Sequence, residues 1–338
     1  MQQQNNRFFC LDVLRGLSAL MIVLYHYTAR YMENPITDNP AKGEWMVVFP
    51  WGCAAVSTFF ILSGFLIAKH IFPNSDSKVA PGQVVQFLKG RVARLYPAFV
   101  VAMFTTIVFL YWGFGTHFSL MQILCNLTML PVLFGQYAID GVYWTLQVEL
   151  FFYIGVAVIM LLGSVRIKKV ALLLWTLTPL FTLIPSDVVS TIINVIFICN
   201  YISAFAAGIA IYSITQRGEM CYSILLLIIS FVSQVFIADV AHIVFFVLTI
   251  VLIYLATKFN SAKVGDNLLV KALKWIGDIS YPLYLVHQMV GFTILYYIQT
   301  TFAITAEWVV VVPIIFSVVY AYVIHKYVEG VGQRLIKR

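Results

Sequence analysis

The sequence predicts an all-α polytopic membrane protein. Of its 338 residues, 62% are hydrophobic and only 10% are charged, and the mean hydropathy is +0.92. Soluble domains are near half apolar and about a quarter charged, so this composition excludes a soluble globular enzyme, a disordered chain and a nucleic-acid-binding protein. The net charge of +7 is therefore interpreted first as a signal of membrane topology.

Apolar segments long enough for a helix to cross the hydrocarbon core, about 20 residues, recur along the chain. We expect ten of them to span the membrane as one helix bundle. In chain order they are 9–29, 47–71, 95–113, 143–163, 169–185, 190–213, 221–238, 241–257, 275–299 and 306–325. The first contains Asp12 and Arg15 and lacks a small-residue cleavage site, so we interpret it as a transmembrane helix and not a signal peptide.

An eleventh segment, 120–138, is less hydrophobic and decides the topology. If it does not span and the N-terminus is cytoplasmic, 19 of the 21 Lys and Arg residues are cytoplasmic; if it spans, only 7 are. Cytoplasmic loops carry an excess of basic residues. We therefore predict ten spans, cytoplasmic termini, and a re-entrant or external segment around 114–142 that forms a wall or roof of a site.

Motifs for bound metals and cofactors do not occur. The five cysteines lie far apart without a CxxC pair, which indicates packing residues and no disulfide framework. The sequence has no HExxH, no P-loop and no GxSxG elbow. We expect no metal ion and no permanently bound cofactor.

Ionisable side chains within the predicted spans are the first candidates for a site, because charge in a bilayer is costly. Arg15 and His26 are eleven residues apart, about 16 Å along a helix axis, and nearly on one stripe, so their face is expected to line a polar channel. Asp12 either pairs locally with Arg15 or belongs to that site. His26 is either a reacting group or an interhelical hydrogen-bonding group, and Glu149 either pairs with a neighbouring cation or contacts a substrate.

Two further motifs have both a structural and a functional interpretation. Arg91 and Arg94, which precede Tyr96 and Pro97, either anchor a helix at the cytoplasmic face or bind phosphate groups, for which guanidinium geometry is suited. In Ser63–Gly64–Phe65, the small residues are expected by default to let two helices approach closely.

Taken in order, five motifs resemble one family. They are Leu14–Ala19 followed by His26; Phe59, Phe60 and Ser63–Phe65; Arg91–Pro97; Tyr143–Tyr153; and Gly277–His287. From residue 8 to about 325, the chain resembles the acyltransferase 3 family of integral membrane O-acyltransferases. We expect one such domain over 1–338, without a fused extracytoplasmic esterase-like domain.

The resemblance implies a ten-helix enzyme of the bacterial inner membrane. It would transfer an acyl group, usually acetyl, from cytoplasmic acyl-CoA to a hydroxyl of a cell-surface polysaccharide or its lipid-linked precursor. Its partners would be acyl-CoA, the glycan or lipid-linked saccharide, and membrane lipids. Carried over by motif, the catalytic residues are His26 and Glu149, the acyl-CoA-binding residues are Arg15, Arg91 and Arg94, and the substrate-binding residues are Trp144, Tyr153, Ser63 and His287.

The mechanism and a competing class remain open from the sequence. His26 acts either as general base or through a transient acyl-imidazole, and Glu149 either orients His26 or binds the sugar. A transporter or channel for a small solute or glycan precursor also fits ten spans, although paired half-repeats, which many transporters have, are absent. The acceptor, the acyl donor's length and the oligomeric state are not specified.

Overall fold

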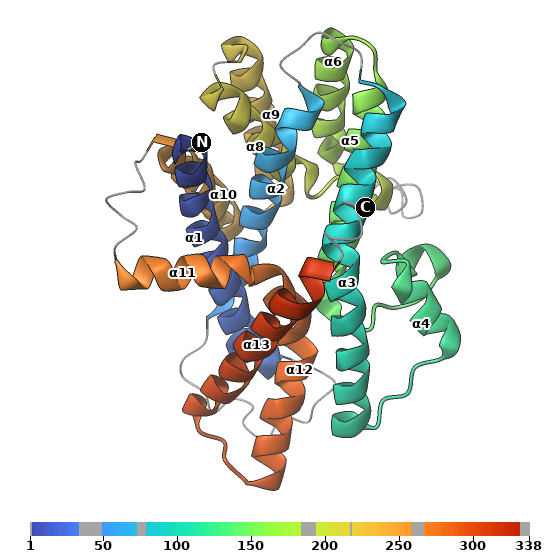
Figure 1. Cartoon of the computed structure of the whole chain (residues 1–338), viewed down its shortest axis with the longest axis vertical. Coiled ribbons are helices and arrows are strands. Elements are labelled where there is room, and N and C mark those ends of the chain that lie inside the picture. The colour runs from blue at the N-terminus through green and yellow to red at the C-terminus, as the bar shows by residue number, and fades with distance from the viewer. Residues whose placement is uncertain are drawn as a thin grey trace. The chain divides into compact units, whose positions relative to one another are not determined.

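The computed structural model describes residues 2–33, 49–72, 79–183, 194–216, 218–258 and 267–331. These residues are mostly helical, and no strand occurs among them (Figure 1). The α-helices are α1 (Gln2–Tyr25), α2 (Val56–Ile71), α3 (Pro81–Phe114), α4 (Leu120–Leu127), α5 (Trp144–Leu161), α6 (Val165–Thr176), α8 (Ile202–Thr215), α9 (Met220–Ile237), α10 (Val240–Lys258), α11 (Leu268–Asp278), α12 (Ser280–Thr301) and α13 (Val311–Ile324).

Seven helical segments of the described chain are long and apolar enough to cross a membrane, which confirms the all-α, multi-pass prediction. They are Phe9–Arg30, Pro50–Ile71, Pro81–Phe114, Gly141–Leu161, Met220–Ile237, Val240–Lys258 and Glu307–Glu329. The other three predicted spans contain the shorter helices α6 and α8 and the less apolar α12. Parts of 169–185 and 190–213 fall in 184–193, outside the described residues, so the count of ten stays a prediction.

The predicted span 275–299 is divided between two helices. The amphipathic helix α11 ends at Asp278, and α12 begins at Ser280. Pro282 explains the break, because a proline ring clashes with the carbonyl four residues earlier and supplies no N–H. In the first turn of α12 the same proline is tolerated.

The connection predicted between residues 72 and 94 is shorter than expected. Helix α3 begins at Pro81, fourteen residues before the apolar segment 95–113. Proline suits the first position of a helix, since its missing N–H would have no partner there. A hydropathy window detects only the apolar part of such a helix, so the basic residues before it, including Arg91 and Arg94, lie on helical backbone.

The segment 114–142 is irregular, as predicted. Its longest helix is the eight-residue α4. The buried Asn126 satisfies the surrounding backbone: its Nδ2 donates to the carbonyl of Tyr137 at 3.0 Å, and its Oδ1 accepts from the N–H of Ile139 at 3.0 Å. Irregular backbone is tolerated beside apolar helices when its polar groups are paired in this way.

The chain divides into two compact units. Unit 1 comprises Met1–Leu11, Ala54–Arg91 and Val148–Asn267; unit 2 comprises Asp12–Cys53, Val92–Gln147 and Leu268–Arg338. The division falls inside α1, α3 and α5, so each of these helices contributes residues to both units.

Unit 1 is built around the close approach of α2 and α8. A Cβ on Gly64 would lie 2.0 Å from the carbonyl oxygen of Phe205, and one on Gly208 would lie 1.9 Å from that of Ile61. Small residues allow membrane helices to approach this closely, and the resulting packing stabilises their association. The default packing interpretation of Gly64 is therefore confirmed.

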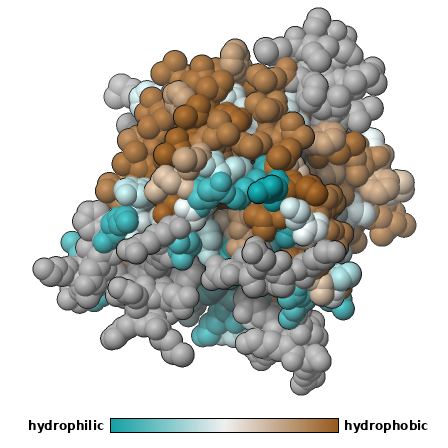
Figure 2. Space-filling view, turned by 90° about the horizontal axis from the view of Figure 1, so that it is seen from above, coloured by the Kyte–Doolittle hydropathy of each residue, from teal (hydrophilic) through white to brown (hydrophobic). Residues whose placement is uncertain are grey.

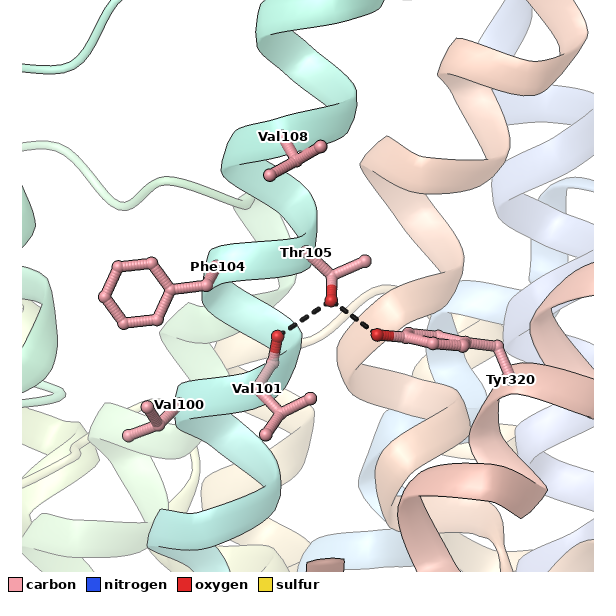
Figure 3. Close-up of a pocket in the computed structure, with 6 residues that line it drawn as sticks. All are labelled: Val100, Val101, Phe104, Thr105, Val108 and Tyr320. Atoms are coloured by element: carbon pink, nitrogen blue, oxygen red, sulfur yellow. Dashed lines mark hydrogen bonds between the residues drawn. The ribbon is translucent and has the colours of Figure 1, made fainter.

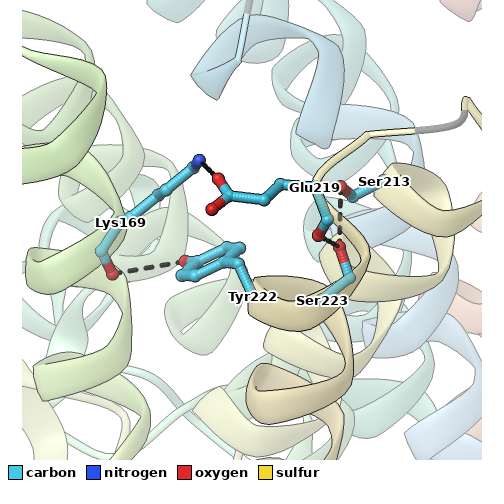
Figure 4. A network of polar contacts seen from close by, with 5 residues as sticks. All are labelled: Lys169, Ser213, Glu219, Tyr222 and Ser223. Atoms are coloured by element: carbon cyan, nitrogen blue, oxygen red, sulfur yellow. Dashed lines mark hydrogen bonds and ion pairs between the residues drawn. The ribbon is translucent and has the colours of Figure 1, made fainter.

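A polar network joins α6, α8 and α9 within unit 1 (Figure 4). Lys169 forms an ion pair with Glu219, and the hydroxyl of Tyr222 donates to the Lys169 carbonyl at 3.2 Å. Ser223 donates to the Ser213 hydroxyl at 2.8 Å. These contacts leave Lys169 in a structural role between helices.

Unit 2 has α12 as its central helix, with thirteen buried residues. Beside it, α11 lies across α1 (Figure 1), where a Cβ on Gly16 would be 1.9 Å from the Leu273 carbonyl oxygen and one on Gly277 would be 1.9 Å from that of Asp12. The two glycines thus allow the two backbones to touch. Gly16 belongs to the first motif and Gly277 to the last, so these motifs meet in space.

Apolar side chains cover much of the coloured part of the face shown in Figure 2. Exposed examples on helices that are long enough to span include Val108, Phe236 and Ile315. Exposed apolar surface of this extent suits contact with lipid, whereas soluble monomers rarely present it.

Substituting Gly64 with alanine should destabilise the protein by roughly 1–3 kcal/mol, because the added methyl overpacks the α2–α8 contact. Gly90→Ala is the matched control: a Cβ there meets nothing within 4 Å, and alanine in a helix interior should raise stability by about 0.5–1 kcal/mol. Thermal unfolding of both variants in detergent measures the difference. Equal unfolding temperatures would contradict the close helix contact.

Candidate functional site

A buried pair of histidines lies at the centre of unit 2. His26 is the first residue of η1 (His26–Arg30), a π-helical turn that continues α1, and His287 lies on α12. The Nδ1 atom of His26 is 3.1 Å from the Nε2 atom of His287, and the rings meet edge to face, with centroids 4.7 Å apart. His26 is 9% exposed and His287 is 0% exposed. π-Helical turns are frequent at functional sites.

Each histidine also contacts a backbone carbonyl of its own helix. His26 Nδ1 lies 2.9 Å from the Ile22 oxygen, and His287 Nδ1 lies 2.8 Å from the Tyr284 oxygen. The side chain of Gln288, the next residue on α12, also interacts with the His26 ring. The pair is therefore held in one geometry from both helices.

Tyr27 and Gly291 fix α12 beside the π-helical turn. The Tyr27 hydroxyl donates to the His287 carbonyl at 2.6 Å and bonds the Ser317 hydroxyl at 2.8 Å. A Cβ on Gly291 would lie 2.2 Å from the Tyr27 ring. Only glycine at that position leaves room for the tyrosine, and hence for the contact between the two histidines.

Asp140 is a buried carboxyl group that sequence reasoning did not single out. It is 0% exposed, accepts from the backbone N–H of Val142 at 3.2 Å, and accepts from that of Met289, on α12, at 3.2 Å. Burial raises the pKa of Asp140 to about 7, against the lowering effect of these hydrogen bonds. In the sequence an Asp before Gly141 is typical of a turn, and only the polarity of 114–142 pointed to the region.

Charged side chains gather where α1 and α11 cross in unit 2. Arg15 pairs with Asp12 at 3.7 Å, as the local alternative predicted. Lys274 pairs with Asp278 at 2.6 Å. Arg15 and Arg94 both interact electrostatically with Glu329. Two of the three predicted acyl-CoA-binding cations thus belong to one charged cluster.

The third cation, Arg91, lies in unit 1 with three other predicted site residues. Its guanidinium is 5.5 Å from the centroid of the Phe87 ring and 5.7 Å from that of Tyr153. The Tyr153 hydroxyl donates to Glu149, and the Ser63 hydroxyl donates to the same carboxylate oxygen at 3.4 Å. Glu149 is thus anchored by two hydroxyl groups. Its proposed link to His26 stays a prediction.

Trp144 is the last of the predicted site residues. It begins α5 and is 39% exposed.

An open apolar groove of about 520 Å³ lies between α3 and α13, where the Thr105 and Tyr320 hydroxyl groups form a hydrogen bond of 2.6 Å (Figure 3). This groove contains none of the predicted site residues. Among the described residues, no cluster of His, Cys, Asp or Glu is suited to hold a metal.

Apolar spanning helices with a buried pair of ionisable rings define a multi-pass membrane protein with an internal polar site. A family model described as "Acyltransferase domain" matches residues 8–326. The chain belongs to this family, the acyltransferase 3 family, as the five motifs indicated.

Two curated proteins illustrate the similarity. "Protein 2 in picA locus" of Rhizobium radiobacter is 36% identical over 104 residues, which are 30% of this chain and 45% of that protein. "Putative acetyltransferase ORF330" of Acidianus two-tailed virus is 23% identical over 154 residues, 45% of this chain and 41% of that protein. The chain thus matches less than half the length of either relative. No solved structure matches the chain.

Stability should depend on pH through Asp140. Its ordinary pKa is 3.8 and its folded pKa is about 7, so the folded state holds an extra proton between these values. The free energy of unfolding should therefore fall as the pH rises from about 4 to 7, by at most about 1.4 kcal/mol per pH unit. Asp140→Asn should flatten this slope, while loss of the Met289 contact lowers stability equally at every pH.

Denaturation followed at several pH values in detergent measures the slope. The matched control is Asp239→Asn, since the backbone N–H of His242 lowers the pKa of that exposed carboxyl. Its contribution is lost as the pH falls, so the decline between pH 4 and 7 should persist. Identical slopes in the wild type and Asp140→Asn would contradict the assignment.

Proposed function

We propose that this chain is a membrane O-acyltransferase that transfers an acyl group from cytoplasmic acyl-CoA to a hydroxyl of a cell-surface polysaccharide or its lipid-linked precursor. Acetyl-CoA is the first donor to test. The observation that carries this proposal is the buried contact between His26 and His287 in a member of an acyltransferase family. A neutral imidazole is suited to take a proton from a hydroxyl near pH 7.

Donor binding is proposed for Arg15, Arg91 and Arg94, because guanidinium groups suit the phosphates of CoA. Arg91 supports this role in a specific way: its Nε atom is buried and has no hydrogen-bond partner among the described residues. Acyl-CoA is a co-substrate in this scheme, and we propose no permanently bound cofactor.

Acceptor binding is proposed for the polar and aromatic side chains of the motifs: Glu149, Tyr153, Ser63 and Trp144. Glu149 either orients the base or binds the sugar. The chain is proposed to act as one acyltransferase domain over 1–338, in the bacterial inner membrane, with both termini cytoplasmic. Support for this orientation comes from the excess of basic residues on one side of the predicted topology.

The chemical step conserves atoms and charge. The acceptor hydroxyl gives its proton to His26 as its oxygen attacks the thioester carbonyl, and the carbon–sulfur bond breaks. The thiolate of CoA then takes the proton from His26. The products are the ester and free CoA thiol, and His26 returns to its neutral form.

His26→Ala should lower acyl transfer by roughly 10²–10⁴-fold, the contribution of a general base. The assay measures free thiol released from acetyl-CoA by the purified protein in nanodiscs, with envelope glycans as acceptor. His242→Ala, which removes a histidine near the start of α10 and outside every proposed site, is the control and should keep wild-type turnover. Full activity in folded His26→Ala would refute the role. Solute movement with an intact thioester would indicate a transporter instead.

Arg94→Ala should weaken acyl-CoA binding by roughly tenfold or more, since a hydrogen bond to a charged group contributes about 1.5–3 kcal/mol. Titration with a non-hydrolysable acyl-CoA analogue measures the affinity. Arg166→Ala, at an exposed position on α6, should bind like the wild type. Unchanged affinity in Arg94→Ala would show that this cation serves only the charged cluster.

A further inference from the structure

The protons on the histidine pair follow from its acceptors. The Tyr284 carbonyl can only accept a hydrogen bond, so His287 Nδ1, 2.8 Å away, carries a hydrogen. The neutral His287 ring then has a bare Nε2 atom. That atom faces the His26 ring and can accept a hydrogen bond there.

The same reasoning fixes the tautomer of His26. Its Nδ1 atom faces two acceptors, the Ile22 carbonyl oxygen at 2.9 Å and the bare His287 Nε2 at 3.1 Å. A single N–H shared between both satisfies them, and a lone pair at Nδ1 would repel both. His26 therefore carries its hydrogen on Nδ1 and its basic lone pair on Nε2. The Gln288 side chain, which also interacts with this ring, has both a donor and an acceptor and so fits this tautomer.

We propose that His287 is a positioning residue for His26: by accepting the Nδ1–H it fixes the ring in the tautomer whose Nε2 accepts the substrate proton. A hydrogen-bond partner on the second nitrogen generally sets which imidazole nitrogen is basic. This rests on the proposed function, in which His26 is the base, and it replaces the substrate-binding role predicted for His287. With both ring nitrogens engaged and 0% exposure, His287 has no atom available for a substrate.

In the proposed reaction His287 exchanges no atom with the substrates. The acceptor proton arrives at His26 Nε2 and leaves from Nε2 to the CoA thiolate, while Nδ1 keeps its hydrogen throughout. During the step His26 is cationic, and the His287 lone pair stabilises the Nδ1–H. The logic is that of a base oriented by a third group.

Two substitutions separate acceptance of a hydrogen bond from packing. His287→Gln can place an amide oxygen near the Nε2 position and so keeps an acceptor. His287→Leu has a similar size without an acceptor. We expect kcat to fall about 100-fold in His287→Leu and by less than about tenfold in His287→Gln, with KM for acetyl-CoA unchanged in both. His242→Gln, near the start of α10, is the control and should keep the wild-type kcat.

Nitrogen NMR of ¹⁵N-histidine-labelled protein reads the tautomer directly. Of the six histidines, His26 is assigned by its loss in His26→Ala. In the wild type we expect a protonated Nδ1 and a bare Nε2. In His287→Leu the His26 signals should broaden or shift toward a tautomer mixture, and His287→Gln should restore them.

Several results would overturn the proposal. They are a proton on Nε2 of His26 in the wild type, full kcat in His287→Leu, or equal losses in the Gln and Leu variants. If His287→Leu does not fold, the wild-type NMR spectrum still decides. Failure of the proposed function gives a different result, because the wild type would then release no thiol from any acyl-CoA. The NMR measurement of the His26 tautomer does not depend on that activity.

Discussion

One shared hydrogen, the Nδ1–H of His26, is the interaction on which the candidate site depends. It connects α1, through Ile22, to α12, through His287, at the residue where the α-helix passes into a π-helical turn. Inside an apolar bundle each polar group must find its partner within the protein. The histidine pair satisfies that rule and still leaves one nitrogen of His26 basic. A carboxylate at either position could act as a base only in its charged form, which would place a charge inside the bundle.

Glycine is the second condition for this geometry. Gly291 makes room for Tyr27, whose hydroxyl holds the His287 carbonyl, and Gly16 and Gly277 let α1 and α11 touch, so that Arg15 reaches the charged cluster. The first and last motifs therefore combine two kinds of residue: polar residues that are candidates for chemistry, and glycines that determine how closely the backbones approach. The polar residues can form the candidate site only where the glycines allow the helices to approach.

Hydropathy predicted the helical class and ten spans, seven of which are helices long and apolar enough to cross a membrane in the described chain, and the motifs singled out both histidines, because these signals are local. Neither signal predicted that His26 and His287, 261 residues apart, are in contact, because that contact depends on how α12 packs against η1. The break before Ser280 was readable from Pro282, whereas the early start of α3 was hidden because its first turns are not apolar. Asp140 escaped notice because its burial comes from α12, which is distant in the sequence.

The tautomer bears on the choice between the two mechanisms left open by the sequence. Under the proposed function, attack by Nε2 on the thioester would produce an acyl-imidazolium that keeps its Nδ1–H. Neutralising that cation requires passing the hydrogen to His287, whose own Nδ1–H ends at the Tyr284 carbonyl, a group that takes up no proton. A lasting cation would then remain among apolar helices, where an isolated charge costs several kcal/mol. General-base catalysis charges the ring only while the proton passes from hydroxyl to thiolate, so the hydrogen-bond pattern favours that route.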